Sequence, residues 1–193
     1  MSETKEKRYK WRRDDYRENT KGLLMVNTGD GKGKTTAAIG VLVRAAGRGL
    51  NCCMIQFMKA KGDRYGEHDS LEKLGVEVHT MGDGFTWDTK NPEQDIKTSE
   101  ATWALCLEKM RSTDYDMLVF DELVYVLDYK FLDISKILAD VRAIRDEQPH
   151  LHIIMTGRNA PPELVEAADL VTEMREIKHP FHAGIYAQQG VEF

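Results

Sequence analysis

The sequence is short of cysteine, of long apolar runs and of basic charge, and each shortage argues against a class of protein. Three cysteines occur in 193 residues, an odd number without a C-x-x-C pair, which favours a reducing compartment such as the cytoplasm over a disulfide framework. No apolar run approaches the roughly 20 residues that a membrane-spanning helix needs. Residues 1–21 also lack the apolar segment of a secretory signal. We therefore expect a cytoplasmic protein without a membrane partner.

The charge balance argues against a nucleic-acid partner. The formal net charge is −5, with 41% hydrophobic and 31% charged residues, an ordinary balance for a soluble globular chain. A net negative protein does not attract nucleic acid as a whole, so any phosphate-binding site has to be built locally.

The chain divides into a charged N-terminal segment, residues 1–21, and a single domain, residues 22–193. The N-terminal segment carries Tyr9, Trp11 and Tyr16 among its lysines and arginines. Base rates favour a solvated tail for such a segment. The aromatic residues favour the alternative, a segment that docks on the protein.

Short apolar runs alternate with helical patterns throughout the single domain. Strands are expected at 22–27, 51–57, 76–79, 117–120, 152–155 and 170–174. Helices are expected at 35–47, 70–74, 103–110, 134–141 and 162–168, and residues 80–97 read as a long irregular loop. This alternation predicts a three-layer α/β fold with a mainly parallel sheet.

Polar clusters follow four of the expected strands. They lie at residues 28–36, 59–64, 121–122 and 156–159. Because ligands of parallel sheets collect at the carboxyl ends of the strands, we expect these clusters to converge on one edge.

The first cluster is a glycine-rich loop of the P-loop kind. Its backbone N–H groups can converge on phosphate, while Lys34 supplies a cation and Thr35 a hydroxyl for Mg²⁺. The usual first glycine of that pattern is replaced by Thr28, and Gly29 comes one residue later. We predict that the loop binds ATP with Mg²⁺ or Mn²⁺. The predicted ATP-binding residues are Thr28, Gly29, Asp30, Gly31, Lys32, Gly33, Lys34, Thr35, Thr36 and Arg44.

Two acids, Asp121 and Glu122, follow the apolar run at 117–120. In P-loop proteins a carboxylate at this place lies near the metal held by the loop hydroxyl. We predict a metal site made by Thr35 and Glu122. An acid after a strand can also simply cap the next helix.

The segment Phe85-Thr86-Trp87 sets two large aromatic side chains among glycines. Exposed aromatic residues on a loop suggest contact with a large flat or apolar ligand, whereas the alternative is that they fill the core. P-loop proteins include kinases, hydrolytic ATPases and binding modules, and the loop alone does not choose among them.

Several longer motifs distinguish among these classes of P-loop protein. They are TGDGKGKTTAAIG, QFMK, GFTW, FDELVY, MTGR and IKHPFHAGIYAQQGVEF, which span Thr28 to Phe193. In this order they resemble the corrinoid adenosyltransferases of the CobA/CobO/BtuR type, the ATP:cob(I)alamin adenosyltransferases. That family usually has asparagine where this chain has Asp30.

The resemblance implies a P-loop NTPase-like (RecA-like) fold and a transferase. The reaction transfers the 5′-deoxyadenosyl group of ATP to cobalt(I) of a corrinoid and releases triphosphate. Cobalt(I) is a strong nucleophile, so the enzyme needs no general base, and Lys34 with the loop and metal stabilises the leaving triphosphate. ATP then lies reversed relative to ordinary P-loop enzymes. The rivals are an ATPase in which Glu122 polarises water, and a binding module without chemistry.

The resemblance also assigns corrinoid-contacting residues and partners. Phe85 and Trp87 would occupy one face of the corrinoid and displace its lower ligand, which makes cobalt(II) easier to reduce by a reduced flavoprotein. The segment around Trp11 would fold over the site. His179 and His182 would lie near the corrinoid, as substrate contacts or packing residues and not as a metal pair. A homodimer is expected by the same analogy.

Overall fold

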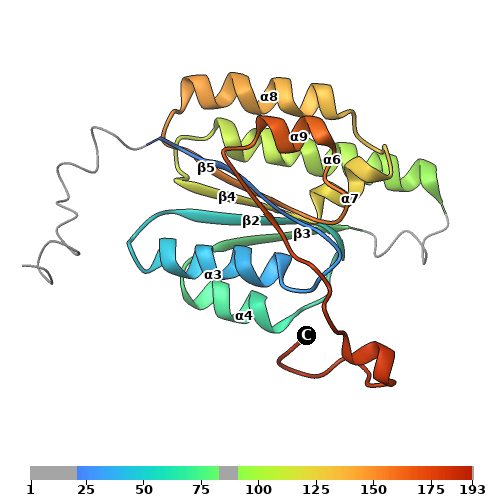
Figure 1. Cartoon of the computed structure of the whole chain (residues 1–193). Coiled ribbons are helices and arrows are strands. Elements are labelled where there is room, and N and C mark those ends of the chain that lie inside the picture. The colour runs from blue at the N-terminus through green and yellow to red at the C-terminus, as the bar shows by residue number, and fades with distance from the viewer. Residues whose placement is uncertain (1–20, 83–90, 193) are drawn as a thin grey trace, which may run out of the picture.

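The fold is a parallel β-sheet between two layers of helices (Figure 1). The computed structural model describes residues 21–82 and 91–192. The sheet has the strand order β3-β2-β4-β5-β1-β6, and every neighbouring pair is parallel. The strands are β1 (Leu24–Thr28), β2 (Cys52–Ala60), β3 (Glu77–Gly82), β4 (Met117–Asp121), β5 (His152–Thr156) and β6 (Leu170–Glu173). The predicted three-layer α/β architecture is confirmed.

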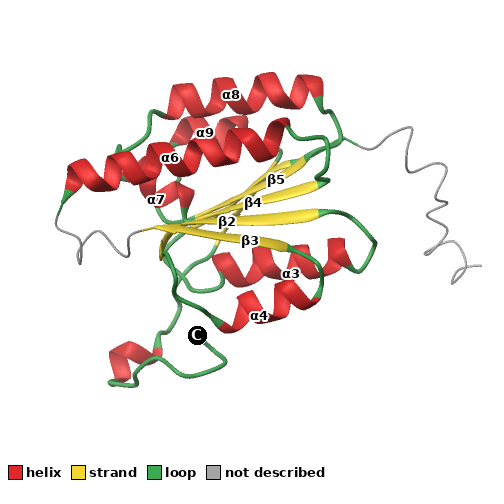
Figure 2. Cartoon of the chain, turned by 180° about the vertical axis from the view of Figure 1, so that it is seen from behind, coloured by secondary structure: helices red, strands yellow, loops and turns green. Residues whose placement is uncertain are grey.

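The helices cover the two faces of the sheet unequally (Figure 2). One face carries α3 (Lys34–Ala46) and α4 (Gly66–Lys73). The other carries α6 (Pro92–Arg111), α7 (Leu123–Asp128), α8 (Ile134–Glu147) and α9 (Pro162–Ala167). A short 3-10 turn, η1 (Pro180–Ala183), lies in the C-terminal segment away from both layers. Among the described residues no helix is long and apolar enough to cross a membrane.

The core lies on both faces of the central strands. All five residues of β4 are buried, because this strand has sheet neighbours on both edges and helices on both faces. Trp103 of α6 stacks edge-on against Phe120 and donates its indole N–H to Asp140 of α8. Burial raises the pKa of the Cys53 thiol to about 12, so this cysteine is an inert core residue.

The stretch between β3 and α6 is shorter than the loop that the sequence suggested. The expectation of a loop over residues 80–97 is wrong at both ends, because β3 continues to Gly82 and α6 begins at Pro92. The start of α6 is set by local chemistry: the Asn91 side chain accepts a hydrogen bond from the Gln94 N–H, and proline occupies the first turn. Phe85 and Trp87 lie outside the described residues.

Candidate nucleotide-binding site

The glycine-rich loop connects the end of β1 to the start of α3. Gly29 and Gly33 have positive φ angles of 94° and 111°, which favour glycine because a side chain would be strained there. Gly33 is the N-cap of α3, so the helix begins at Lys34. The N–H groups of the first turn and the positive dipole end of α3 therefore face the same space as the loop, an arrangement suited to an anion.

A cavity of about 780 Å³ opens at this edge of the sheet. Its walls come from the loop, from the segment after β2, from the end of β4 and from the segment after β5, so the four polar clusters converge as predicted. The residues that line it include Asp30, Lys32, Lys34, Thr35, Lys59, Tyr65, Glu67, Glu122, Thr156, Arg158 and Glu192.

Asp121 is the hub of a buried hydrogen-bond network at the floor of this cavity. Its Oδ1 accepts from the hydroxyls of Thr35 and Thr156, each at 2.7 Å, and its Oδ2 accepts from the Gln56 amide at 3.1 Å. Asp121 has no exposed surface. Three donors satisfy the buried carboxylate, which fixes the position of the Thr35 hydroxyl.

The network continues through Gln56 and His68, two residues that were not predicted as part of the site. Gln56 accepts at its Oε1 from His68 Nε2 at 2.6 Å, and His68 Nδ1 accepts from the Tyr65 N–H at 3.3 Å. These bonds require the neutral Nε2–H tautomer, and burial lowers the pKa of His68. The available signal was one polar residue, Gln56, inside the otherwise apolar run of residues 52–58 in β2.

Glu122 has a different environment from its neighbour Asp121. Its backbone has a positive φ of 64°, unusual for a non-glycine residue, and its N–H donates to the Thr156 hydroxyl at 2.9 Å. Its Oε2 is buried without a hydrogen-bond partner among the described residues. Burial, together with the negative charge of Asp121, raises the pKa of Glu122 well above its usual range. A buried, unpartnered carboxylate oxygen at a cavity wall is suited to a cation.

Lys34 lies curled over the loop. Its ammonium group donates to the carbonyls of Gly29 at 2.7 Å and Gly31 at 2.8 Å. Burial, and then the positive charge of Arg158, lower the pKa of Lys34. Lys34 and Arg158 both line the cavity, so an anion bound there would offset their positive charges.

The outside of the loop packs against the C-terminal segment, which the sequence did not reveal. The Gly31 N–H donates to the Met174 carbonyl at 2.7 Å. A Cβ atom on Gly29 would lie 2.4 Å from that carbonyl oxygen, so these glycines also allow a close backbone approach. From the cavity side, Glu192 forms an ion pair of 2.5 Å with Lys32.

Several predicted site residues do not line the cavity. Arg44 is exposed in the last turn of α3, about 15 Å along the helix from Lys34 at 1.5 Å per residue. His179 caps the start of η1 and His182 lies within it, with ring centroids 6.1 Å apart. His182 also contacts Glu176. Trp11, Phe85 and Trp87 fall outside the described residues.

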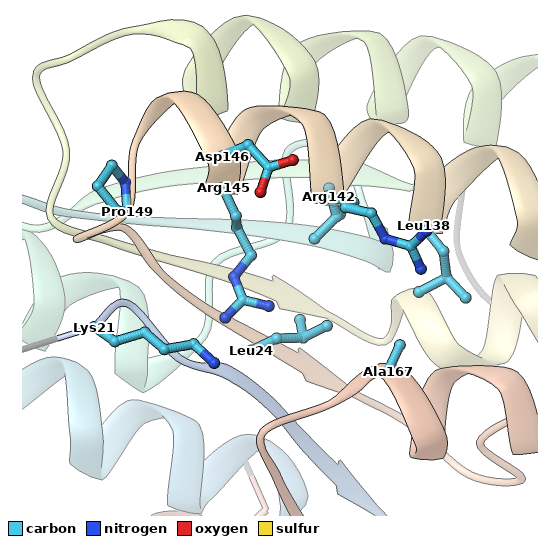
Figure 3. A pocket seen from close by; sticks show the side chains of 9 residues that line it. Lys21, Leu24, Leu138, Arg142, Arg145, Asp146, Pro149 and Ala167 are labelled. Atoms are coloured by element: carbon cyan, nitrogen blue, oxygen red, sulfur yellow. The ribbon is translucent and has the colours of Figure 1, made fainter.

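A second, smaller cavity of about 360 Å³ lies at the amino-terminal ends of the strands, below α8 (Figure 3). Lys21 and Arg145 border it and both pair with Asp169, at 2.6 and 2.5 Å. Burial opposes ionisation of Asp169, but bonds from Lys21 and from the Leu24 N–H, with the charge of Arg145, lower its pKa to about 2. These contacts tie the start of β1 to α8 and β6.

The fold and the site define a class. A glycine-rich loop between β1 and α3, with a buried aspartate at the end of β4, two strands away in the sheet, is the arrangement of P-loop NTPase-like proteins. A solved structure of the same fold is the flagellar accessory protein FlaH from Methanocaldococcus jannaschii. Its TM-score is 0.52 at 12% identity, with 79% of this chain and 71% of that chain covered.

The family follows from comparison of the sequence. The family model "ATP:corrinoid adenosyltransferase BtuR/CobO/CobP" matches residues 20–193, and the chain belongs to this family. It is 44% identical to a corrinoid adenosyltransferase from Sinorhizobium sp, over 90% of this chain and 81% of that protein. The corrinoid adenosyltransferase of Pseudomonas aeruginosa is 41% identical over 90% and 84%. Corrinoid adenosyltransferase CobA of Salmonella typhimurium is 39% identical over 90% and 86%.

Proposed function

We propose that this protein transfers the 5′-deoxyadenosyl group of ATP to cobalt(I) of a corrinoid and releases inorganic triphosphate. The observation that carries the proposal is the family match, which spans the glycine-rich loop and the rest of the domain. The cavity supports it, because it offers loop N–H groups and the cations of Lys32, Lys34 and Arg158 to a polyanion.

The reaction needs position and charge from the protein. An electron pair on cobalt forms the bond to the 5′-carbon of ATP, the bond from that carbon to its oxygen breaks, and its electrons leave with triphosphate. No proton is transferred, so no general base is required. The loop N–H groups and Lys34 would hold the triphosphate and stabilise the negative charge that develops on it. ATP would lie reversed relative to ordinary P-loop enzymes, with its 5′-carbon instead of its γ-phosphate at the reacting centre.

A divalent cation, Mg²⁺ or Mn²⁺, fits the residues at the cavity floor. Such ions prefer oxygen ligands, and the Thr35 hydroxyl and the unpartnered Glu122 carboxylate are the candidates. Asp121 already accepts three hydrogen bonds, so its role would be to orient Thr35. When bound, the ion would neutralise part of the triphosphate charge.

The corrinoid contacts and partners belong to the same proposal. Phe85 and Trp87 would displace the lower ligand of cobalt, and the segment around Trp11 would cover the site. His179 and His182 lie on an exposed segment. The same segment carries the exposed large apolar residues Ile177, Phe181 and Tyr186, which together could contact a large apolar ligand. A reduced flavoprotein would supply the electron, and the enzyme would act in the cytoplasm as a homodimer.

One experiment separates this function from its rivals. Protein, Mg-ATP and a chemically reduced corrinoid are mixed, and the corrinoid spectrum and the phosphate products are followed together. The proposal predicts inorganic triphosphate in step with formation of a cobalt–carbon bond. ADP and phosphate would instead indicate an ATPase in which Glu122 polarises water, and unchanged ATP would indicate a binding module.

A further inference from the structure

The C-terminal segment enters the nucleotide cavity. Ala187, Gly190, Val191 and Glu192 all contribute to its lining, although they are more than 150 residues away from the loop in sequence. Both views place the C-terminal end beside the layer of α3 and α4 (Figures 1 and 2). In addition to the hydrogen bond from the Gly31 N–H to the Met174 carbonyl, the segment contacts the loop through the ion pair of Lys32 Nζ with Glu192 Oε2. The Glu192 side chain is 18% exposed and that of Lys32 is 50% exposed.

The carboxylate of Glu192 lies in a place that is otherwise suited to phosphate. The loop presents N–H groups, the N-terminal end of α3 adds a positive dipole, and Lys32 adds a cation. The other acids that line the cavity are Asp30 of the loop, Glu67, which pairs with Lys59 outside the loop, and Glu122, whose Oε2 has no partner among the described residues. Glu192 is the acid paired with a cation of the loop itself. A triphosphate bound at Lys32 would therefore meet a carboxylate that already occupies this cation.

We propose that Glu192 competes with the triphosphate for Lys32. When ATP binds, the triphosphate displaces the Glu192 carboxylate, and when inorganic triphosphate leaves, Glu192 returns to Lys32. The identity of that product rests on the proposed function, but the competition itself concerns only the polyphosphate. The apparent affinity for polyphosphate is then the intrinsic affinity multiplied by the fraction of molecules in which the Lys32–Glu192 pair is open.

The size of the effect follows from the exposure of the pair. Because the Glu192 side chain is 18% exposed, we take the upper part of the range for partly exposed ion pairs, about 0.6–1 kcal/mol, which corresponds to an affinity change of about three- to fivefold. Glu192→Gln keeps the size of the side chain and removes its charge. We therefore expect this variant to bind inorganic triphosphate and Mg-ATP about three- to fivefold more tightly than the wild type.

Calorimetry without corrinoid provides the test. Titrations of inorganic triphosphate with Mg²⁺, and of Mg-ATP, are compared for the full-length wild type, Glu192→Gln and the control Glu166→Gln, which removes an exposed acid on α9. Tighter binding by Glu192→Gln with unchanged binding by Glu166→Gln supports the proposal. Unchanged or weaker binding by Glu192→Gln overturns it, since a weaker complex would mean that Glu192 helps to hold the nucleotide. Matching melting curves verify that each variant is folded.

A double-mutant cycle tests whether the effect acts through Lys32. In a Lys32→Gln background, Glu192→Gln is expected to change triphosphate affinity by less than twofold, because its competition partner is gone (about 0.4 kcal/mol). An equal gain in both backgrounds would refute the pairing mechanism. Since no corrinoid is present, the result is independent of whether adenosyl transfer is observed.

Discussion

The Thr35 hydroxyl donates a hydrogen bond to Asp121 Oδ1 across 2.7 Å, which joins the first turn of α3 to the end of β4. The hydrogen of that hydroxyl points toward Asp121, so the lone pairs of its oxygen are available to a cation in the cavity. Asp121 is buried and also accepts from Thr156 and Gln56. The two adjacent acids thus have separate proposed roles: Asp121 positions Thr35, and Glu122 offers an oxygen to the metal.

Replacing Asp121 with Asn should disturb both stability and metal-nucleotide binding. The amide that replaces the carboxylate cannot accept all three hydrogen bonds, so at least one buried donor loses its partner. We expect a loss of about 1–3 kcal/mol in the free energy of unfolding and weaker Mg-ATP binding. Denaturant unfolding and calorimetry measure the two effects. Asp146→Asn, on the exposed side of α8, is the control, and unfolding identical to wild type would contradict the network.

Lys34→Ala should abolish most ATP binding. The ammonium group rests on two loop carbonyls, from which it can move to the phosphates. Hydrogen bonds to charged groups contribute about 1.5–3 kcal/mol, so ATP affinity should fall by about 10- to 150-fold. Calorimetric titration of Mg-ATP checks this against Lys73→Ala, an exposed lysine at the end of α4. Intact affinity in Lys34→Ala would remove the loop from the site.

Glu122 should make the ligand-free protein less stable as pH rises. Burial and the charge of Asp121 raise its pKa above the ordinary 4.5. Between these two pKa values the folded protein binds more protons than the unfolded chain, so the free energy of unfolding falls with rising pH. Glu122→Gln removes this dependence, and its stability relative to wild type should increase by up to about 1.4 kcal/mol per pH unit in that window.

Unfolding curves between about pH 5 and pH 8, without nucleotide or metal, measure that difference. Parallel stability profiles for the two proteins would show that Glu122 is not buried as described. The same substitution should weaken Mg²⁺ binding in the presence of ATP, because a neutral amide replaces the proposed carboxylate ligand. Equal Mg²⁺ affinity in both proteins would contradict the metal role.

The double variant Phe85→Ala/Trp87→Ala tests the proposed displacement of the lower cobalt ligand. Adenosylation that starts from cobalt(II) with a reduced flavoprotein should slow by at least about tenfold more than adenosylation of chemically reduced cobalt(I), a difference of about 1.4 kcal/mol in barrier. Spectroscopic rates with the two starting states provide the comparison. An equal loss with both substrates would argue for a plain binding role.

Removing residues 2–20 tests the N-terminal segment. The truncation keeps Lys21, because its ion pair with Asp169 helps to hold the start of β1. If the segment around Trp11 covers the site, corrinoid turnover should fall by at least about tenfold while Mg-ATP still binds with wild-type affinity. Turnover equal to wild type would favour the solvated tail.

Much of the fold was predictable because each element follows from a local pattern. The apolar runs at 117–120 and 152–155 agree with β4 and β5 to within one residue, since completely buried strands are continuous apolar runs. The end of the irregular loop was misjudged because the first turns of α6 are polar and have no apolar stripe to reveal them. The short helix α7 after Glu122 was likewise not expected.

The phosphate loop, the family and the edge of the sheet at which the polar clusters meet could all be predicted from residue patterns, because they depend on residue types at short spacing. The three-dimensional packing was needed to show that Asp121 is enclosed by donors, that Gln56 and His68 support it, and that Glu192 reaches Lys32. Such contacts join elements up to 160 residues apart. They depend on how the whole sheet and its flanking segments pack, which no local pattern of residues encodes.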